Sequence, residues 1–459
     1  MTVSSGIFRM YDIRGVYGED LNDESLAVIS KAIGTFFFNK GIKQIIIAND
    51  NRVSGPKIKE ILIKGLLNTG ADVLDLGTAL NPFVYYSWYK LDVNASVIIT
   101  ASHNPAKYNG FKISINKHPL SGDEYQEILK ICQSAKFSTG SGGLEKYDIW
   151  PEYKEEIKKD IKLGKKLKVV LDCGNGTAGL FAPEILKELG CEVLPLFTES
   201  DGNFPNHDPY PQKVELYGKL IETIKSEKAD LGLSFDGDGD RLGVYDDQGN
   251  FVENDRLAMI FAKDISLKNK KAKIVMNIST SLAVMDFIKS CGSEIILWKT
   301  GYPFISGKMK EIGAIFGGEI SGHFFFKDRY FGYDDGLYSG LRALEVVSNS
   351  EESLSVIASK LPKYFETREN RVEVPEGKDK FTISQNIAQE IKREFPQAEV
   401  IDFDGLRFSF PDGWGLVRPS NTEPVISIRA EGKTEKKLEA IKHLIKCKLI
   451  NNGITFEWS

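Results

Sequence analysis

Short apolar runs alternate with amphipathic stretches from the start of the chain. Runs rich in Val, Ile and Leu at 44–48, 73–76 and 97–100 predict strands, and the stretch 56–67 has the apolar spacing of a helix. Strands that alternate with helices are typical of a sheet built from βαβ units. We therefore expect an α/β domain over residues 1–150.

The same plan returns twice further along the chain. The predicted elements are a charged helix after Trp150, strands at 168–172 and 231–235 with a helix at 183–189, and strands at 273–276, 295–298 and 314–316. They indicate two more α/β domains with mixed sheets, at 151–250 and 251–365. The likeness of the three is architectural, because no residue-level repeat is visible.

The last segment, 366–459, follows a different pattern. Its predicted elements are a helix at 381–393, short strands near Glu399, Leu406, Gly415 and Val425, and a final helix from Lys433. They predict a smaller α+β domain, in which helices cover an antiparallel sheet. Its place at the end of the chain suggests a lid or cap.

An acidic loop directly after the apolar run 231–235 carries the strongest chemical signal. It reads Asp-Gly-Asp-Gly-Asp-Arg, and its charged members are Asp236, Asp238, Asp240 and Arg241. Carboxylates at alternate positions can converge on one hard divalent cation, since glycines let the backbone curl between them. The alternatives are a solvated acidic turn or a calcium loop of the EF-hand type. Arg241 excludes the EF-hand, which requires glycine at that position.

A presented serine is the second candidate. Residues 100–105 read Thr-Ala-Ser-His-Asn-Pro, which places the Ser102 hydroxyl and His103 between an apolar run and a proline that bars further helix or strand. An ordinary capped turn would have the same composition.

Two further loops carry hydrogen-bonding groups. After the predicted strand 314–316, Glu319 and Ser321 are two residues apart and lie on the same side of the chain, as needed to bind adjacent hydroxyls of a sugar. His323, in the same loop, could transfer protons near neutral pH. In the last segment, the loop from Arg418 to Pro424 is suited to a phosphate; its members with polar side chains include Arg418, Ser420, Asn421 and Thr422, and Arg429 follows one strand later. A tight hairpin with an incidental arginine is the alternative for the second loop.

Other motifs are weak by themselves. Near the start of the chain are Tyr11 and Arg14, and Lys112 follows later. Single charged or polar side chains of this kind usually lie on the surface, in contact with solvent. A glycine-rich turn at 172–179 fits a dinucleotide fingerprint, but nothing else in the chain supports a nucleotide site.

Composition excludes several classes of protein. The chain has 459 residues, of which 42% are hydrophobic and 27% charged, as in a globular protein of several domains. A net charge of -5 argues against a nucleic-acid surface. No apolar run approaches the roughly 20 residues that cross a bilayer, and no signal-peptide pattern is present, so we expect a cytoplasmic protein without a membrane partner. The five cysteines form no CxxC pair, and we expect them reduced and buried.

Taken in order, these motifs resemble the α-D-phosphohexomutase superfamily, most closely its phosphomannomutase/phosphoglucomutase branch. The resemblance runs from residues 8–15 through the serine loop, the acidic loop and the segments 319–323 and 331–336 to the Arg418 loop. It implies four domains around a central active-site cleft, and an enzyme that interconverts hexose 1-phosphate and hexose 6-phosphate. The reaction would pass through a phosphoserine and a hexose 1,6-bisphosphate, with that bisphosphate as activator.

The resemblance also implies a role for each candidate residue. Ser102 would carry the phosphate, and Mg²⁺ would be held by Asp236, Asp238, Asp240 and a phosphoryl oxygen on Ser102. The remaining site residues would be Arg14, His103, Lys112, Arg241 and His323 at the transfer site, Glu319 and Ser321 at sugar hydroxyls, Arg418, Ser420, Asn421, Thr422 and Arg429 at the second phosphate, and Tyr11 and Tyr302 as further substrate contacts.

Three positions depart from the family pattern. Tyr302 stands where relatives have histidine, Ser279 where they often have lysine, and Asn49 where arginine is common. The first two usually contact substrate, so sugar preference stays open between mannose, glucose and glucosamine. A phosphoglucosamine mutase, or a weakly catalytic sugar-phosphate binding protein, is the alternative function. The oligomeric state has no signal in the sequence.

Overall fold

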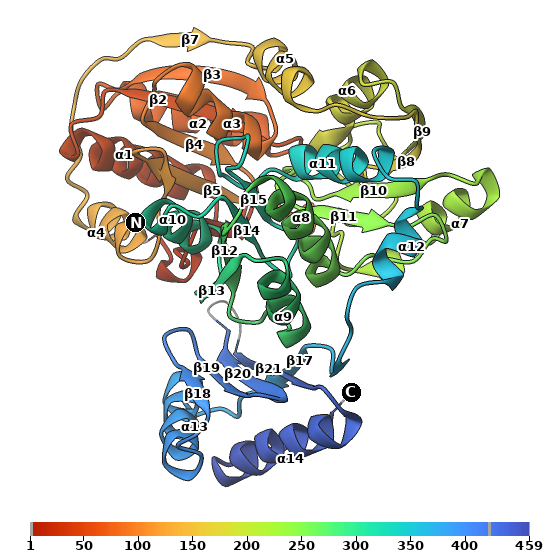
Figure 1. Cartoon of the computed structure of the whole chain (residues 1–459). Coiled ribbons are helices and arrows are strands. Elements are labelled where there is room, and N and C mark those ends of the chain that lie inside the picture. The colour runs from red at the N-terminus through yellow and green to blue at the C-terminus, as the bar shows by residue number, and fades with distance from the viewer. Residues whose placement is uncertain (1–2, 421–423, 459) are drawn as a thin grey trace.

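A computed structural model describes residues 3–420 and 424–458. Its main strands form four sheets, which follow one another along the chain. The first three sheets lie together in one body, and the C-terminal sheet with its helices lies beside them at the bottom of Figure 1. The expected fold class, three mixed α/β units followed by an α+β unit, is confirmed.

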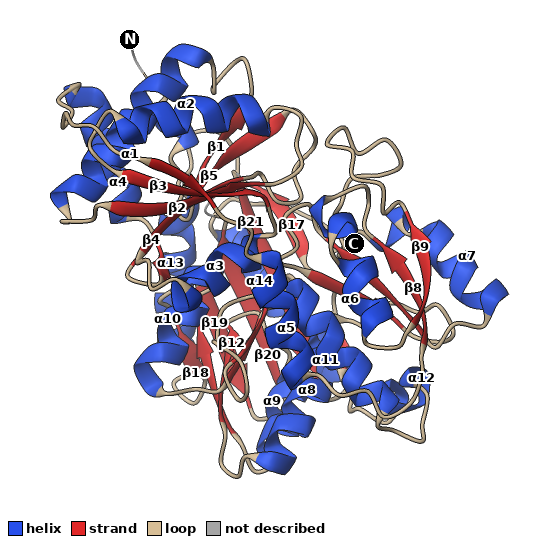
Figure 2. Ribbon diagram, turned by 90° about the horizontal axis from the view of Figure 1, so that it is seen from above, coloured by secondary structure: helices blue, strands red, loops and turns tan. Residues whose placement is uncertain are grey.

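The first sheet has seven strands, in the order β1-β5-β4-β2-β3-β7, with β6 paired to β5. Its elements are η1 (Ser5–Ile7), β1 (Ile13–Val16), α1 (Asp23–Asn39), β2 (Gln44–Asn49), α2 (Gly55–Leu67), β3 (Asp72–Thr78), α3 (Asn81–Lys90), β4 (Ala95–Ile99), β5 (Tyr108–Ile115), β6 (His118–Pro119), α4 (Asp123–Ser134) and β7 (Leu144–Lys146). Helices α1, α2 and α4 cover one face, as the view from above shows (Figure 2).

The second and third sheets have four strands each, in the orders β11-β10-β8-β9 and β13-β12-β14-β15. The second unit contains α5 (Trp150–Asp160), β8 (Lys168–Asp172), η2 (Thr177–Leu180), α6 (Ala182–Glu188), β9 (Glu192–Leu196), η3 (Val214–Leu216), α7 (Gly218–Glu227), β10 (Leu231–Phe235) and β11 (Leu242–Tyr245). The third contains α8 (Asn254–Lys268), β12 (Lys273–Asn277), α9 (Leu282–Ser290), β13 (Glu294–Trp298), α10 (Tyr302–Ile312), β14 (Phe316–Gly318), β15 (Phe324–Phe326), α11 (Gly336–Ser348) and α12 (Leu354–Ser359).

One strand plan is repeated in all three sheets. The sets β2, β3, β4, β5, then β8, β9, β10, β11, then β12, β13, β14, β15 have the same neighbours, with three parallel strands and a fourth that pairs antiparallel to the third. The serine loop, the acidic loop and the loop with Glu319 each connect the third strand of a set to its fourth. The repeat therefore delivers three chemically different loops from one structural position.

The C-terminal unit is an antiparallel sheet of six strands, in the order β16-β21-β20-β19-β18 with β17 paired to β21. Its elements are β16 (Phe365–Glu366), β17 (Asn370–Glu373), α13 (Lys380–Glu394), β18 (Glu399–Ile401), β19 (Leu406–Phe410), β20 (Gly413–Pro419), β21 (Val425–Gly432) and α14 (Glu435–Asn451). The two helices lie against the sheet, as expected, while the short strands β16 and β17 were not predicted.

The first three units share a hydrophobic core, whereas the C-terminal unit has a separate one. The largest core runs continuously through the first three units, for example from Trp88 through Val169 to Ile274. The C-terminal unit has its own core, and a small cluster that includes Ile278 and Trp414 joins it to the third unit. Burial of apolar surface therefore fixes the three α/β units to one another more firmly than it fixes the fourth.

The composition led to expectations about membrane-spanning segments and about the cysteines. None of the helices in the described part of the chain is long and apolar enough to span a bilayer. All five cysteines are unpaired; Cys132, Cys173 and Cys191 are buried, but Cys291 and Cys447 are partly exposed, so the prediction that all five are buried was wrong.

Buried polar groups hold the C-terminal unit on the third. Arg407 of β19 is fully buried and donates hydrogen bonds of 2.7 Å to the carbonyls of Ile278 and Thr280. Glu431 of β21 accepts hydrogen bonds from the backbone N–H groups of Leu282 and Ala283, where α9 begins. A negative charge at a helix start is favourable, since the helix dipole is positive there.

We expect the substitution Arg407→Ala to destabilise the C-terminal unit by about 3 kcal/mol or more, because it leaves two buried carbonyls without donors. Calorimetric unfolding and limited proteolysis measure the effect. Arg393→Ala is the control, since that side chain is 76% exposed. Equal behaviour of the two variants would contradict the assignment of Arg407 as the main polar anchor.

Candidate active site

The serine loop is held in a strained conformation. Ser102 has φ +51°, in the left-handed region that residues with a side chain rarely adopt. Its N–H donates to the Thr100 hydroxyl at 2.8 Å. Buried Arg52 donates to backbone carbonyls of the loop, and these acceptors are Ser102, Asn104, Pro105 and Tyr108. One guanidinium thus fixes the path of the chain around the presented hydroxyl.

The acidic loop meets this hydroxyl across the boundary between the first two units. Ser102 Oγ lies 2.6 Å from Asp236 Oδ2 and 3.1 Å from His103 Nδ1. Asp236, Asp238 and Asp240 are fully buried, and an oxygen of each lies within 4.8 Å of the others. The predicted convergence of the three carboxylates with the serine is therefore present.

The carboxylates fit a divalent cation. Asp238 Oδ1 and Asp240 Oδ1 are buried and have no hydrogen-bond partner. An unsatisfied buried anion is costly, and hard cations such as Mg²⁺ prefer oxygen ligands of this kind. The donor set, the orphaned oxygens and the adjacent serine all suit a metal ion better than an acidic turn open to solvent.

Lys112 of β5 supplies a positive charge to the same cluster. Its ammonium lies 2.7 Å from Asp238 Oδ2 and 2.5 Å from Asp240 Oδ2. Asn81, at the start of α3, donates to Asp240 at 2.9 Å. Burial alone would lower the pKa of Lys112, but the two aspartates raise it well above its usual value.

The carboxylates are unlike in their electrostatics. Burial, followed by the charges of Asp240 and Asp238, raises the pKa of Asp236 well above its usual value. Burial acts in the same direction on Asp240, but Lys112 above all, with His323 and Arg241, lowers the pKa of that carboxyl. The cluster therefore depends on nearby cations to stay ionised.

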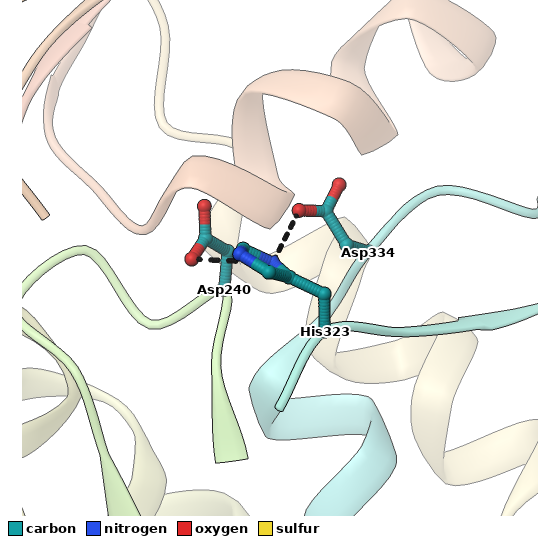
Figure 3. Close-up of side chains that lie close together, drawn as sticks. All are labelled: Asp240, His323 and Asp334. Atoms are coloured by element: carbon teal, nitrogen blue, oxygen red, sulfur yellow. Dashed lines mark ion pairs between the residues drawn. The ribbon is translucent and has the colours of Figure 1, made fainter. Parts of the chain in front are cut away.

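A histidine lies between two carboxylates on the other side of the cluster. His323 Nδ1 is 2.9 Å from Asp334 and 3.7 Å from Asp240. Figure 3 shows the histidine ring between the two carboxylates. Arg241 Nε donates to His323 Nε2 at 3.0 Å. Burial lowers the pKa of His323, but Asp240 and Asp334 outweigh it and raise the pKa. Asp334 therefore orients the histidine beside the acidic loop. Asp334 was not among the site residues predicted from the sequence.

Arg14 and His103 flank the serine loop. Arg14 donates to the side chain of Asn104 at 2.9 Å and pairs with Asp12 at 2.6 Å. The His103 ring lies 4.5 Å from the ring of Tyr210. Arg14 therefore contacts the serine loop at Asn104, and His103 lies against the Ser102 hydroxyl.

The turn before α10 gathers the predicted sugar contacts. Glu319 is buried and accepts a hydrogen bond from the Gly301 N–H at 2.7 Å. The Tyr302 hydroxyl donates to the Tyr11 carbonyl at 3.2 Å, and its ring lies 5.4 Å from the Lys112 ammonium. Burial raises the pKa of Glu319 and that of Tyr302. Ser321 lies half-buried in the loop after Glu319.

The predicted phosphate residues lie in the C-terminal unit. Arg418, the second-last residue of β20, pairs with Asp404, and Ser420 is buried directly after that strand. Arg429 is on the neighbouring strand, where the Ser279 carbonyl, Asp255 and Glu366 bind its guanidinium, so in this conformation it belongs to the contact between the third and fourth units. The predicted residues Asn421 and Thr422 lie outside the described residues.

A cavity of about 500 Å³ adjoins these residues. Met10, Lys299, Phe304, Phe381 and Pro419 are among the residues that line it, so it lies where the first, third and fourth units face one another. The cavity provides space beside the Arg418 loop.

Other motifs serve the contacts between units. Asn51 donates from its backbone N–H to Thr177 at 3.0 Å and from its side chain to the carbonyl of Asn175 at 2.6 Å. The glycine-rich turn at 172–179 therefore packs against the first unit, which supports the view that it is no nucleotide loop.

A buried serine beside a carboxylate trio, with cations around both, suits phosphoryl transfer, which depends on positioning and on compensation of charge. Comparison with known families agrees. Models described as the alpha/beta/alpha domains I, II and III and the C-terminal domain of phosphoglucomutase/phosphomannomutase match residues 5–139, 151–249, 253–365 and 369–446. The chain belongs to the phosphoglucomutase/phosphomannomutase family, a family of isomerases that act as phosphotransferases.

Individual relatives resemble the chain over nearly its whole length. A phosphomannomutase/phosphoglucomutase of Pseudomonas aeruginosa is 42% identical over 98% of this chain and 96% of its own. A phosphoglucomutase of Neisseria gonorrhoeae is 40% identical over 98% of each. The crystal structure of a phosphoglucomutase/phosphomannomutase family protein from Burkholderia thailandensis has a TM-score of 0.92 and 37% identity, and covers 99% of this chain and 100% of that one.

We expect Lys112→Met to lower the free energy of unfolding by about 3 kcal/mol in EDTA, because it leaves buried carboxylates without their cation. Added Mg²⁺ should restore part of that loss, since a ligand that binds only the folded state stabilises it. Denaturation with and without Mg²⁺ measures both effects.

Lys117→Met is the matched control, since Lys117 pairs with Asp92, whose side chain is 88% exposed. That variant should change stability by no more than about 0.5 kcal/mol. A Lys112→Met protein that is as stable as the control in EDTA would contradict the proposed charge balance.

Proposed function

We propose that this protein is a phosphohexomutase that interconverts the 1-phosphate and 6-phosphate of mannose or glucose, with Ser102 as the carrier of the phosphoryl group. The contact that supports this most directly is the 2.6 Å approach of Ser102 Oγ to Asp236, 134 residues away. A simple binding protein has no need of a buried hydroxyl held in a strained turn beside three carboxylates.

Phosphoryl transfer needs a phosphate carrier, positive charge at the transferred group and an acceptor for the hydroxyl proton, and we assign a residue to each. In one half of the cycle the bond from phosphorus to Ser102 Oγ breaks, and a bond from phosphorus to a sugar hydroxyl oxygen forms, with loss of the hydroxyl proton. Arg14, Lys112 and Arg241 balance the charge of the transferred group. His323, oriented by Asp334, is our candidate for taking that proton, and His103 lies on the other side of Ser102.

Mg²⁺ fits the carboxylate trio and would be held by Asp236, Asp238, Asp240 and an oxygen of the phosphorylated Ser102. When bound, it supplies positive charge at the phosphoryl oxygens. Sugar hydroxyls would bind Glu319 and Ser321, with Tyr11 and Tyr302 beside them. The non-reacting phosphate would bind the loop from Arg418 to Thr422, with Arg429 as a further member once its present partners release it.

We expect Ser102→Ala to lower kcat by at least about a thousandfold, because it removes the phosphate carrier. Intact-mass measurement after incubation with glucose 1,6-bisphosphate should find one added phosphoryl group on the wild-type protein and none on the variant. Glucose 1-phosphate should then discharge it.

A wild-type protein that never accepts phosphate from the bisphosphate would exclude the mutase and favour the sugar-phosphate binding alternative. Ser121→Ala, at a serine outside the site, is the control for the variant. Its phosphorylation and turnover should match the wild type.

The sugar preference generates a separate test. Ile320 between Glu319 and Ser321 favours the mannose and glucose type over phosphoglucosamine mutase. We expect kcat/KM to be about tenfold higher for mannose 1-phosphate or glucose 1-phosphate than for glucosamine 6-phosphate, a ratio that a few changed contacts can produce. Equal or better turnover of glucosamine 6-phosphate would overturn this assignment.

Several sequence-based predictions stand as part of the proposal. They are the domain limits 1–150, 151–250, 251–365 and 366–459, the hexose 1,6-bisphosphate activator, the cytoplasmic location, and the absence of nucleic-acid or membrane partners. The small-molecule phosphosugar remains the proposed ligand.

A further inference from the structure

The loop at 403–405 of the C-terminal unit docks on the active-site turn of the third unit. Asp404 Oδ2 accepts a hydrogen bond from the Thr300 N–H at 2.8 Å. Next to it, the Phe403 ring lies 5.0 Å from the ring of Trp298. The loop thus has one polar and one apolar contact with the residues that lead into α10.

The same loop supports the arginine of the phosphate loop. Asp404 Oδ2 lies 3.3 Å from Arg418 Nε. Gly405 has φ +79°, and a Cβ there would lie 2.7 Å from Arg418 Cα, so a larger residue would displace the loop. When the Nε side of a guanidinium faces a carboxylate, the two terminal nitrogens on the opposite side can still donate hydrogen bonds to a phosphate.

The turn at 299–301 is held from two further sides. Glu319, the proposed sugar-binding carboxylate, accepts from the Gly301 N–H at 2.7 Å, and the Tyr11 hydroxyl is 3.5 Å from the Thr300 carbonyl. Groups from the first, third and fourth units therefore bind successive backbone groups of one turn.

We propose that Asp404 is a positioning residue for the phosphoryl-transfer reaction. Its carboxylate contacts both Arg418 and the 299–301 turn, and the same turn donates a hydrogen bond to Glu319. Asp404 thereby sets the distance between the proposed phosphate site and the proposed sugar site. This inference rests on the proposed function. A sugar phosphate held at both ends gains affinity and correct orientation only when the two sites keep that separation.

Loss of Asp404 should leave the fold in place. Arg407 and Glu431 anchor the C-terminal unit through separate contacts with residues 278–283. The Phe403 and Trp298 rings also remain. Removal of the Asp404 carboxylate therefore disturbs the register of the site and not the attachment of the unit.

The test compares Asp404→Ala and Asp404→Asn with the control Asp402→Asn. Asp402 lines the same cavity, but it pairs with Lys392 at 2.6 Å, and both side chains are about half exposed. Calorimetric titration of the unphosphorylated proteins with glucose 1-phosphate and with glucose 6-phosphate gives the Kd values. Steady-state kinetics then give KM and kcat.

We expect Asp404→Ala to weaken both sugar phosphates about tenfold or more, and by similar factors, because the phosphate site serves both orientations. Asp404→Asn keeps an acceptor for Thr300 but loses the charge opposite Arg418, so a loss of severalfold is expected. In both variants KM should rise more than kcat falls, and Asp402→Asn should match the wild type.

Wild-type Kd and KM values in both Asp404 variants would overturn the proposal, as would an equal loss in Asp402→Asn. If Asp404→Ala unfolds, as a thermal scan would detect, Asp404→Asn decides alone. A wild-type protein that binds neither sugar phosphate would instead refute the proposed function, and the two failures are therefore distinguishable.

Discussion

Three buried carboxylates within reach of one another are the constraint on which the site depends. Like charges in a low-dielectric interior repel strongly, and each also loses its hydration. Asp236, Asp238 and Asp240 remain together because Lys112 reaches them from the first unit and Arg241 and His323 lie beside them. The charges that compensate the cluster thus come from different units, and the site can exist only when those units are assembled.

The repeated strand plan explains how so distant residues meet. Each set of four strands ends in a hairpin between a parallel and an antiparallel strand, and each hairpin loop carries part of the chemistry. Such loops leave the carboxyl end of a parallel strand, which is where ligands bind in open α/β sheets. One arrangement of strands thus presents a serine, three aspartates and a glutamate with its neighbouring serine from the same structural position.

The sequence was most informative where the functional residues of the site are neighbours along the chain. The acidic loop, the serine loop and most strands were predictable, because adjacent carboxylates, a proline and apolar runs have local meaning. Strand β14 lies two residues later than predicted, since Gly317 and Gly318 within it carry no strand signal. Arg52 and Asn81 were missed because the loop carbonyls and the Asp240 carboxylate that they bind lie 50 residues or more away. Asp334 was missed because nothing in its local sequence marks it as the partner of His323. In isolation each looks like an ordinary surface residue.

The continuous core of the three α/β units has a consequence for the reaction cycle. Displacement of one unit relative to another would expose apolar surface that all three share, so the units that carry the three loops form a fixed frame. In the proposed reaction, a bisphosphate would present first one end and then the other to Ser102, and a fixed frame could not follow that change. The sugar itself would then have to turn, and the C-terminal unit, with its separate core, is the part of the protein that could make room for it.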